Sequence, residues 1–385
     1  MTPEQAQEKY HWIKYDKATN TVEMYLDNYL LSNSRICEGM FYLEHLLWIE
    51  PKYQTDGTTV QVGTETKYIR KPWFFDFGEY IHWCLEQYYK YIKLNSRPPV
   101  ISEWLINCEA KWKAMRMDEY ANSISESDVK KYEEVKGWQG VAGLLTQYYA
   151  YYWDIRLRII DTEITFGYNK EVLIGCFEII IGNNPCDFNP RPLIIYCYLT
   201  GRIDLLVDNG NKIGPVDHKT THKFDGYEHE DFNPHDGICG YILAMHDILK
   251  KYQAEGLTQI PQCNGGWIYH ISSCSPGQPI DKSKKPGPRF KTTPVDKNDE
   301  QLEDYKARQL STFKRIAELL FNNKTPEWNT SACNYMFFRK CKYKPIHEQP
   351  SSQWPKIIND FYQIGKPWDT REHSSKEEKE ETSKP

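Results

Sequence analysis

Apolar residues recur at helical spacing through most of the first 160 residues. Residues 23–50 carry them at mixed i+3 and i+4 intervals, and residues 77–93 follow the same pattern. Residues 100–118 and 127–158 are rich in aromatic residues and polar on one face. A period of about 3.6 residues is typical of amphipathic helices, so the pattern predicts four helices in this part of the chain.

The pattern becomes extended after about residue 160. Runs of β-branched and apolar residues, separated by turn residues, predict strands in "TEITFGY", "EVLIGCFEIII" and "LIIYCYLTGRIDLLV". Farther along, "NPHDGICGYILAMHDILKKY" predicts a helix, "GGWIYHISSC" a strand, residues 275–300 a Pro- and Lys-rich loop, and "EQLEDYKARQLSTFKRIAELLF" a charged helix. Helices followed by a cluster of strands indicate an α/β fold, with a core sheet and an N-terminal helical elaboration.

Residues 201–221, "GRIDLLVDNGNKIGPVDHKTT", predict a β-hairpin, because "DNGN" favours a reversing turn between two extended runs. Side chains alternate along a strand, so Asp217 and Lys219 face one way and His218 the other. Pairing of the two strands can bring Asp204 beside Asp217. Two carboxylates with an ammonium group two residues on suit Mg²⁺ or Mn²⁺ and an activated water. The alternative is a surface hairpin with an ordinary salt bridge.

The composition is that of a folded protein. The chain has 385 residues, of which 40% are apolar, and it contains 28 Tyr and 12 Trp. No apolar run approaches the roughly 20 residues of a membrane span, and the opening "MTPEQAQEKYHW" lacks the basic flank and apolar stretch of a secretory signal. The 11 cysteines are scattered, which favours thiols or metal ligands over a disulfide framework. We therefore expect a cytoplasmic protein that is not embedded in a membrane.

The net charge of −5 argues against broad, non-specific adhesion to nucleic acid, but it allows a local basic groove. Two segments are basic: residues 281–291, "DKSKKPGPRFK", and residues 337–344, "FFRKCKYK", where aromatic residues are interleaved. Each is either a DNA-contacting segment or a solvated loop. The candidate DNA-binding side chains in these segments are Lys284, Lys285, Arg289, Lys291, Arg339, Lys340 and Lys342.

The hairpin, together with the helices before and after it, resembles the PD-(D/E)XK nuclease superfamily. The family's central motif, an acid on one strand and acid-x-Lys on the next, is matched by Asp204, Asp217 and Lys219. The resemblance runs from about residue 31 to residue 347 and is to the RecB-like branch, which includes phage exonucleases and CRISPR-adaptation nucleases. It implies a restriction-endonuclease-like fold, in which a central mixed sheet is flanked by helices.

Two helices carry the remaining motifs. The family's upstream helix motif, in loose form Gly…His-x-x-x-Glu, is matched by Gly78, His82 and Glu86. Its trailing helix motif, Gln-x-x-x-Tyr, is matched at the catalytic position Tyr241, whereas Gly237 stands where the family has glutamine. That glutamine normally helps to hold DNA near the metal, so its absence puts the grip on substrate in doubt more than the metal chemistry.

The resemblance also implies roles for the site residues. Asp204 and Asp217 would hold Mg²⁺ or Mn²⁺ with the backbone carbonyl of His218, and His82 would add an imidazole ligand, which shifts preference toward Mn²⁺. Lys219 would orient or deprotonate the attacking water and stabilise charge on the phosphate. The alternative for His82 is an ordinary packed histidine of a helix.

Some members of this family hold an iron–sulfur cluster with one cysteine near the N-terminus and three near the C-terminus. Cys37 lies in a segment similar to the first of these, and Cys333, Cys341 and His347 lie near the other end of the chain. Cys and His together can bind a [4Fe–4S] cluster or zinc. The alternative is that these cysteines are simple thiols.

These motifs predict how the chain is divided. A nuclease domain is expected over residues 31–350, after an N-terminal segment of residues 1–30. Within it we expect a helical insertion at about 94–160 and a catalytic core at about 161–275. Residues 351–385 would form a C-terminal extension, disordered after about residue 370, where no apolar residue remains.

The function expected from this resemblance is a metal-dependent deoxyribonuclease. It would act on DNA ends or single strands, in viral or bacterial recombination, repair or defence. The chain carries no Walker-type phosphate loop, so a helicase or annealing protein would act in trans. Two alternatives are a structure-specific or restriction-type endonuclease on the same core, and a DNA-binding module whose nuclease site has decayed.

Overall fold

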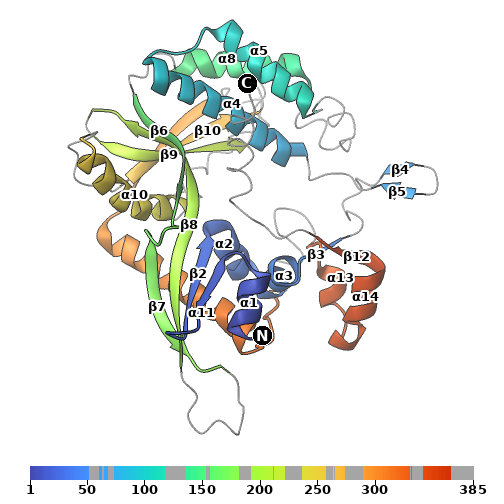
Figure 1. The fold of residues 1–385 in the computed structure, drawn as a ribbon. Coiled ribbons are helices and arrows are strands. Elements are labelled where there is room, and N and C mark those ends of the chain that lie inside the picture. The colour runs from blue at the N-terminus through green and yellow to red at the C-terminus, as the bar shows by residue number, and fades with distance from the viewer. Residues whose placement is uncertain are drawn as a thin grey trace, which may run out of the picture. The chain divides into compact units, whose positions relative to one another are not determined.

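The chain folds into two compact units, which are described separately (Figure 1). The first comprises Met1–Tyr68, Phe166–Gly201 and Glu303–Pro385, and the second comprises Ile69–Thr165 and Arg202–Leu302. The structure is a computed structural model, and it describes residues 1–51, 60–62, 65–67, 73–115, 117, 135–152, 157–181, 192–210, 212–221, 236–256, 263, 265–273, 289–329, 331 and 341–365.

A mixed sheet forms the centre of the first unit. Its strands are β1 (Ile13–Asp16), β2 (Thr21–Asp27), β7 (Leu173–Ile179) and the first half of β8 (Leu193–Asp208). β2 pairs with β1 in antiparallel and with β8 in parallel orientation, and β7 pairs antiparallel with β8. Alternate residues of β8 are buried, as expected for a strand that covers a core: Ile195, Cys197 and Leu199.

Helices from both ends of the sequence complete the first unit. They are α1 (Pro3–Lys9), α2 (Asn28–Ile36), α3 (Glu38–Phe41), the π-helical turn η1 (Tyr42–Leu46), α11 (Asp299–Phe321), α13 (Lys344–His347), the 3₁₀ turn η3 (Ser351–Gln353) and α14 (Trp354–Phe361). Two short antiparallel ladders accompany them: β3 (Ile49–Pro51) with β12 (Tyr362–Ile364), and β4 (Val60–Val62) with β5 (Glu65–Lys67).

The predicted helix over residues 23–50 is wrong at its beginning. Residues up to Asp27 belong to β2, and the helix starts only at Asn28. The cause is a cap: the backbone N–H of Leu30 donates to Oδ1 of Asp27 at 2.7 Å, so the aspartate ends the strand and begins α2. The prediction is also wrong at its end, because Ile49 and Glu50 belong to β3. Between these strands the range is divided into α2, α3 and η1.

One apolar cluster joins segments from the two ends of the sequence within the first unit. Cys37, Met40 and Leu43 pack there with Cys341 and Tyr343. The hydroxyl of Tyr343, which is fully buried, donates to the backbone carbonyl of Ile49 at 2.5 Å. Burial of this cluster therefore holds α13 and its neighbours against the N-terminal helices.

The second unit is a sheet covered by helices on both faces. Its strands are β6 (Arg158–Phe166), the second half of β8, β9 (Ile213–Thr221), β10 (Gly265–Ser272) and β11 (Phe290–Asp296). Its helices are α4 (Trp73–Asn95), α5 (Ile101–Ala114), α8 (Trp138–Tyr152) and α10 (Asp236–Ala254). β9 pairs antiparallel with β8 and parallel with β10, and α10 lies between β9 and β10 in sequence.

The two faces of this sheet are distinguished by alternation along the strands. Tyr269 and Val216 belong to the large aromatic core formed with α4, α5 and α8. The neighbouring Ile268 packs instead with Val295 and with Ile238 of α10. Because adjacent residues of a strand point to opposite faces, α10 covers the face opposite to α4.

Hydrogen bonds connect the strands in the order β1-β2-β8-β9-β10-β11, with β6 and β7 also paired to β8. The predicted α/β class with a mixed sheet flanked by helices is confirmed. The loop predicted over residues 275–300 is wrong for Phe290–Asp296, which forms β11. The strand contains Pro294 and ends the hydrogen-bonded order, and edge strands are where sheets tolerate proline.

Within the described residues, no helix is both long and apolar enough to cross a membrane. The predicted disordered tail after about residue 370 lies outside the described residues, and the predicted division into segment, nuclease domain and extension stays a prediction.

Candidate active site

The predicted hairpin is confirmed, and both acids lie at the end of its paired segment. β8 and β9 pair from Asp208↔Ile213 to Leu205↔Val216, and Asp204 and Asp217 are the next residues of the two strands. Oδ2 of Asp204 accepts a hydrogen bond from the backbone N–H of His218, the residue after Asp217, at 2.9 Å. The Asp204 carboxylate therefore lies beside the Asp217–Lys219 segment of β9.

Asp217 and Lys219 share a face of β9, as the alternation predicts. Nζ of Lys219 lies 2.9 Å from Oδ2 of Asp217, and the Asp217 side chain is only 4% exposed against 37% for Lys219. Burial lowers the pKa of Lys219, but the charges of Asp217 and Asp204 outweigh it and hold the pKa above its usual value. Lys219 is thus an ammonium group held in place by a buried carboxylate.

His82 reaches the same acids from α4. Its Nδ1 lies 3.4 Å from Oδ2 of Asp204. Burial raises the pKa of Asp204, yet the charge of His82 and hydrogen bonds from His218 and His82 keep that pKa well below its usual range. Conversely, burial lowers the pKa of His82 and the charge of Asp204 raises it, with a net increase. Gly78 allows this approach, since a Cβ there would lie 3.1 Å from Oγ1 of Thr220 on β9.

His218 connects Asp204 with the aromatic core. Its backbone N–H donates to Oδ2 of Asp204 at 2.9 Å, and its side chain is 3% exposed. Nε2 lies 3.3 Å from the hydroxyl of Tyr148, which in turn lies 2.7 Å from the hydroxyl of Tyr89. Burial lowers the pKa of His218, and the hydrogen bond with Asp204 opposes the shift. The predicted metal contact through its carbonyl stays a prediction.

Tyr241 lies on the α10 side of the sheet. Since Val216 faces α4, alternation turns Asp217 toward α10, and Tyr241 packs there against Ile238 and Ile268. Burial, followed by the negative charges of Asp217 and Asp204, raises the pKa of Tyr241 well above its usual value. The phenol is therefore neutral at physiological pH and lies within electrostatic reach of the acids.

Glu163 on β6 is a residue of this site that the sequence does not reveal. Its side chain is 14% exposed, and Oε2 lies 2.7 Å from Nε of Arg202. Burial, followed by the charge of Asp204, raises the pKa of Glu163 to about 8, while Arg202 lowers it. Its φ of 52° is rare for any residue other than glycine, and such strain is often found at functional sites. The one sequence feature that points to a buried acid here is Arg202, a basic residue two positions before Asp204 on β8.

Glu163→Gln is expected to remove a pH-dependent loss of stability. A carboxyl whose pKa rises from 4.5 to about 8 on folding contributes stability below pH 4.5 that is lost as the pH rises through 8. We therefore expect wild type to lose about 1 kcal/mol or more relative to Glu163→Gln between pH 5 and pH 9, because one pKa unit corresponds to about 1.4 kcal/mol. Urea unfolding in EDTA measures the difference.

Glu178→Gln is the control for this measurement, because Glu178 is an exposed residue of β7 outside the site. If Glu163→Gln and Glu178→Gln change the pH profile equally, burial does not shift the Glu163 carboxyl.

The side chains of the site are of the chemical types that bind a divalent ion. Asp204, Asp217 and His82 offer the oxygen and nitrogen donors that Mg²⁺ and Mn²⁺ accept. In this structure Asp204 is paired with His82, and Asp217 with Lys219. Throughout the described part of the chain, no three His, Cys, Asp or Glu side chains are grouped closely enough to hold an ion. Binding would require these side chains to exchange their pairing partners for the metal.

The other predicted metal ligands lie in the first unit. Cys37 and Cys341 are buried in the same apolar cluster, and each sulfur accepts a backbone N–H, from Asn329 at 3.5 Å and Tyr343 at 3.4 Å respectively. The ring of His347 stacks on Trp328 with centroids 4.5 Å apart. Cys333 lies outside the described residues. The structure thus brings these segments together without arranging a metal group among the described side chains.

The predicted DNA-binding residues have different surroundings. Arg289 is 6% exposed, and its guanidinium donates to the carbonyls of Ser272 and Ser273 and to Oε1 of Gln147, which gives it a structural role. Lys291 is half-buried in β11. Nζ of Lys342 lies 2.9 Å from Oε1 of a glutamate, Glu44. Lys284, Lys285, Arg339 and Lys340 lie outside the described residues.

Comparison with known proteins identifies the family. Residues 31–346 match the model of the PD-(D/E)XK nuclease superfamily, and the chain belongs to this superfamily. No curated protein matches the chain. Among solved structures, "Crystal structure of SSO0001" is similar at 12% identity, over 63% of this chain and 79% of that chain, with a TM-score of 0.23.

Proposed function

We propose that the protein is a metal-dependent deoxyribonuclease that hydrolyses phosphodiester bonds. The observation that carries the proposal is the β8–β9 hairpin, where Asp204 and Asp217 are the next residues beyond the paired segment and Lys219 is held 2.9 Å from Asp217. Membership of a nuclease superfamily supports it. These three side chains combine the metal-binding acids and the cationic group that phosphodiester hydrolysis needs.

Each side chain has a physical role in this proposal. Asp204 and Asp217, with His82, would hold Mg²⁺ or Mn²⁺, and a bound ion of this kind neutralises the phosphate and acidifies its water. The low pKa of Asp204 keeps that carboxylate ionised and ready to bind. Lys219, positioned by Asp217, would orient the attacking water and stabilise charge on the phosphate. Glu163 would add a further carboxyl group beside Asp204, which its raised pKa keeps largely protonated at neutral pH.

The substrate proposal is narrower. The protein would cut DNA ends or single strands as an exonuclease, in viral or bacterial recombination, repair or defence. The order of the RecB-like motifs supports this substrate, with motif residues at His82, Asp204, Asp217 and Tyr241. A helicase or annealing protein would act in trans, in the cytoplasm of a bacterial cell or a virus-infected host. Lys291 and Lys342, with the basic residues outside the described part, would contact the DNA.

Gly237 favours a second candidate, a DNA-binding module whose nuclease site has decayed. It is the second residue of α10 and stands where the family motif has a glutamine, so a side chain that grips DNA is missing there. The intact hairpin favours the enzyme.

Purified protein with Mn²⁺ or Mg²⁺ on end-labelled linear and circular DNA, single- and double-stranded, tests the proposal. We expect wild type to degrade linear DNA and Asp217→Asn to be inactive, since the variant lacks a carboxylate of the site. Cutting of circles would indicate an endonuclease. Binding without cleavage by wild type with either ion would favour the decayed module.

We also propose that Cys37, Cys333, Cys341 and His347 bind one [4Fe–4S] cluster or zinc ion, which would join the two ends of the chain. The shared burial of Cys37 and Cys341 supports this. Anaerobically purified protein that is colourless and contains neither iron nor zinc would contradict it.

A further inference from the structure

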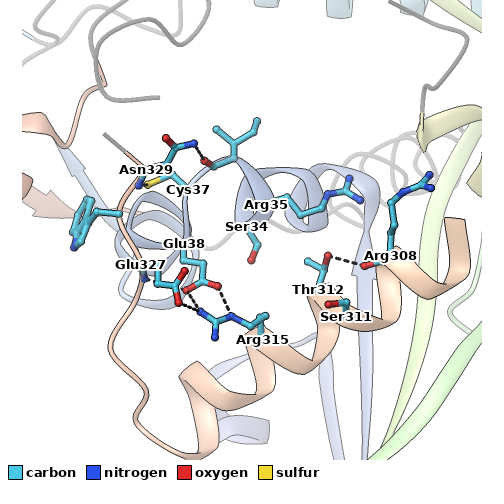
Figure 2. Close-up of a pocket in the computed structure, with 12 residues that line it drawn as sticks. Ser34, Arg35, Cys37, Glu38, Arg308, Ser311, Thr312, Arg315, Glu327 and Asn329 are labelled. Atoms are coloured by element: carbon cyan, nitrogen blue, oxygen red, sulfur yellow. Dashed lines mark hydrogen bonds and ion pairs between the residues drawn. The ribbon is translucent and has the colours of Figure 1, made fainter. Parts of the chain in front are cut away.

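A cavity of about 430 Å³ lies in the first unit, between α2, α11 and the segment around Trp328 (Figure 2). It is outside the hairpin site, and of the residues that the sequence analysis singled out only Cys37 is among those that line it. We call it the arginine pocket. Its polar lining includes Ser34, Arg35, Arg308, Ser311, Thr312 and Arg315, together with Glu38, Glu327 and Asn329.

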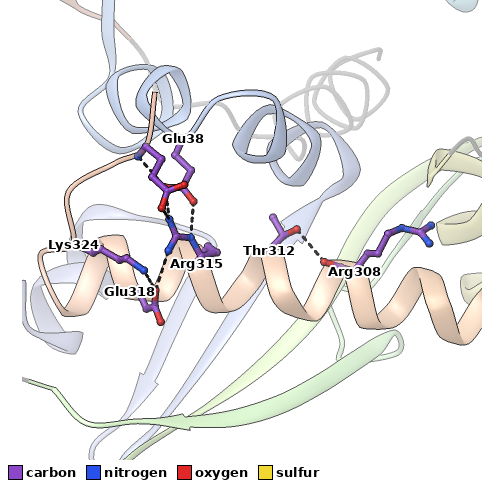
Figure 3. Close-up of polar contacts among 7 residues, drawn as sticks. Glu38, Arg308, Thr312, Arg315, Glu318 and Lys324 are labelled. Carbon is purple, nitrogen blue, oxygen red and sulfur yellow. Dashed lines mark hydrogen bonds and ion pairs between the residues drawn. The ribbon is translucent and has the colours of Figure 1, made fainter. Parts of the chain in front are cut away.

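One wall of the arginine pocket is a network of ion pairs (Figure 3). Nε and Nη2 of Arg315 donate to the two carboxylate oxygens of Glu38 at 2.6 and 2.9 Å, and Nη2 also donates to Oε1 of Glu327 at 2.8 Å. The backbone N–H of Glu327 donates to Glu38 at 3.0 Å. This two-point contact links α3, α11 and the segment at residue 327, so the wall is preformed.

The opposite part of the pocket is cationic and open to solvent. Arg35, in the last turn of α2, and Arg308 of α11 both line it and are exposed. Figure 2 shows the two side chains extending to the same side of the gap between their helices. The lining contains three arginines and two acids, and both acids contact Arg315. The lining therefore has a net positive charge.

These features suit a phosphate ester. Guanidinium groups bind phosphate oxygens through two parallel N–H bonds, and the hydroxyls of Ser34 and Ser311 lie in the same lining as further donors. Ile36 and Trp328 add apolar surface against which a sugar or base can pack. The volume falls within the range of about 300–1,000 Å³ found for ligand sites.

We propose that the arginine pocket binds a phosphate and its adjoining nucleotide in a nucleic-acid strand, through Arg35 and Arg308. The proposal rests on the proposed function, because the strand would be the substrate of the hairpin site. It adds a second contact point for that strand, formed by α2 and α11. Such a contact would supply grip on DNA in a chain that has Gly237 in place of the family's glutamine.

Binding is measured separately from cleavage in the full-length Asp217→Asn protein, by fluorescence anisotropy of a single-stranded oligonucleotide at several salt concentrations. We expect Arg35→Gln/Arg308→Gln in this background to weaken binding at least tenfold. The slope of log affinity against log salt should fall by about 1.4, since each phosphate contact on a single strand contributes about 0.7. Both arginines are exposed, so the melting temperature should not change.

Lys17→Gln/Lys314→Gln is the matched control, because it removes the same charge from exposed positions of the first unit outside the pocket. Equal affinity and salt slope for the two double variants would overturn the proposal. Melting temperatures are measured for all variants. If the arginine variant unfolds, Arg35→Lys/Arg308→Lys replaces it. A loss of affinity smaller than tenfold is then expected, because lysine keeps the charge but lacks the bidentate fork of arginine.

Competition identifies the source of the phosphate. Inorganic phosphate and a mononucleotide are titrated against the bound oligonucleotide. Weak competition by both supports a strand, whereas displacement by either at the oligonucleotide's own dissociation constant would overturn it in favour of a free ligand. If wild type cleaves no DNA but binding still depends on Arg35 and Arg308, the nuclease proposal fails and the pocket stands. If wild type cleaves DNA but the arginine variant binds the oligonucleotide as well as its parent does, the pocket proposal fails and the nuclease proposal stands.

Discussion

Lys219→Met is expected to lower the rate of DNA cleavage by about 10²–10³-fold, the usual loss when one group that stabilises transition-state charge is removed. Nζ of Lys219 lies 2.9 Å from the buried carboxylate of Asp217, which fixes its direction. Methionine keeps the length of the side chain but cannot orient water or offset charge. Single-turnover cleavage of a labelled strand at saturating Mn²⁺ measures the effect on the chemical step.

Divalent-ion binding should respond differently to the substitutions. Lys219 is not a metal donor, so calorimetric Mn²⁺ binding to Lys219→Met should remain within a few-fold of wild type, whereas Asp217→Asn should bind more weakly. Lys250→Met is the matched control, because Lys250 of α10 forms an exposed ion pair, also at 2.9 Å, with Asp247. Wild-type cleavage by Lys219→Met would show that Lys219 has no part in the reaction.

Gly167→Ala is expected to destabilise the protein by about 3 kcal/mol or more, a size that indicates a specific structural clash. Gly167 follows β6 with a φ of 87°, and a Cβ there would lie 2.0 Å from the carbonyl oxygen of Leu199 and 2.8 Å from Cα of Thr200. Those atoms belong to β8, which is hydrogen-bonded to β2 and β7 on its two sides. The backbone therefore cannot move away cheaply.

Gly210→Ala separates this clash from backbone strain. Gly210 has the same φ of 87°, but a Cβ there would meet nothing within 4 Å. The control should lose only the roughly 1–2 kcal/mol that a left-handed conformation costs an ordinary residue. Urea unfolding of both variants measures the difference, and equal losses would show that contact with β8 is unimportant.

The hairpin and its acids could be predicted from the sequence because their geometry is local. The turn signal after Asp208 predicts the hairpin, and the register of that hairpin brings Asp204 and Asp217 to the end of its paired segment. A period of two then puts Lys219 beside Asp217. The helical spacing of residues 77–93 likewise predicts α4, although not the distance from His82 to Asp204. Family membership was also predictable, since it depends on motif order.

Glu163 and His218 show what local patterns omit. Glu163 lies in an ordinary strand pattern, and its raised pKa comes from burial and from Asp204 on another strand. Alternation turns His218 away from Asp217, yet its backbone N–H and Nδ1 lie 2.9 and 3.7 Å from Oδ2 of Asp204. Neither the strain at φ 52° nor these distances follow from periodicity, because both depend on how β6, β8 and β9 pack.

The first unit is where tertiary structure decides most. The sequence by itself determined most of the helices and central strands, although not β2 or β11, and which side chains of the hairpin share a face, because backbone geometry repeats over a few residues. Only packing brings Cys37 into one cluster with Cys341, and Arg35 into one pocket with Arg308. These partners are far apart in sequence, and they meet because burying apolar surface favours one arrangement of whole elements, which no local pattern of residues records.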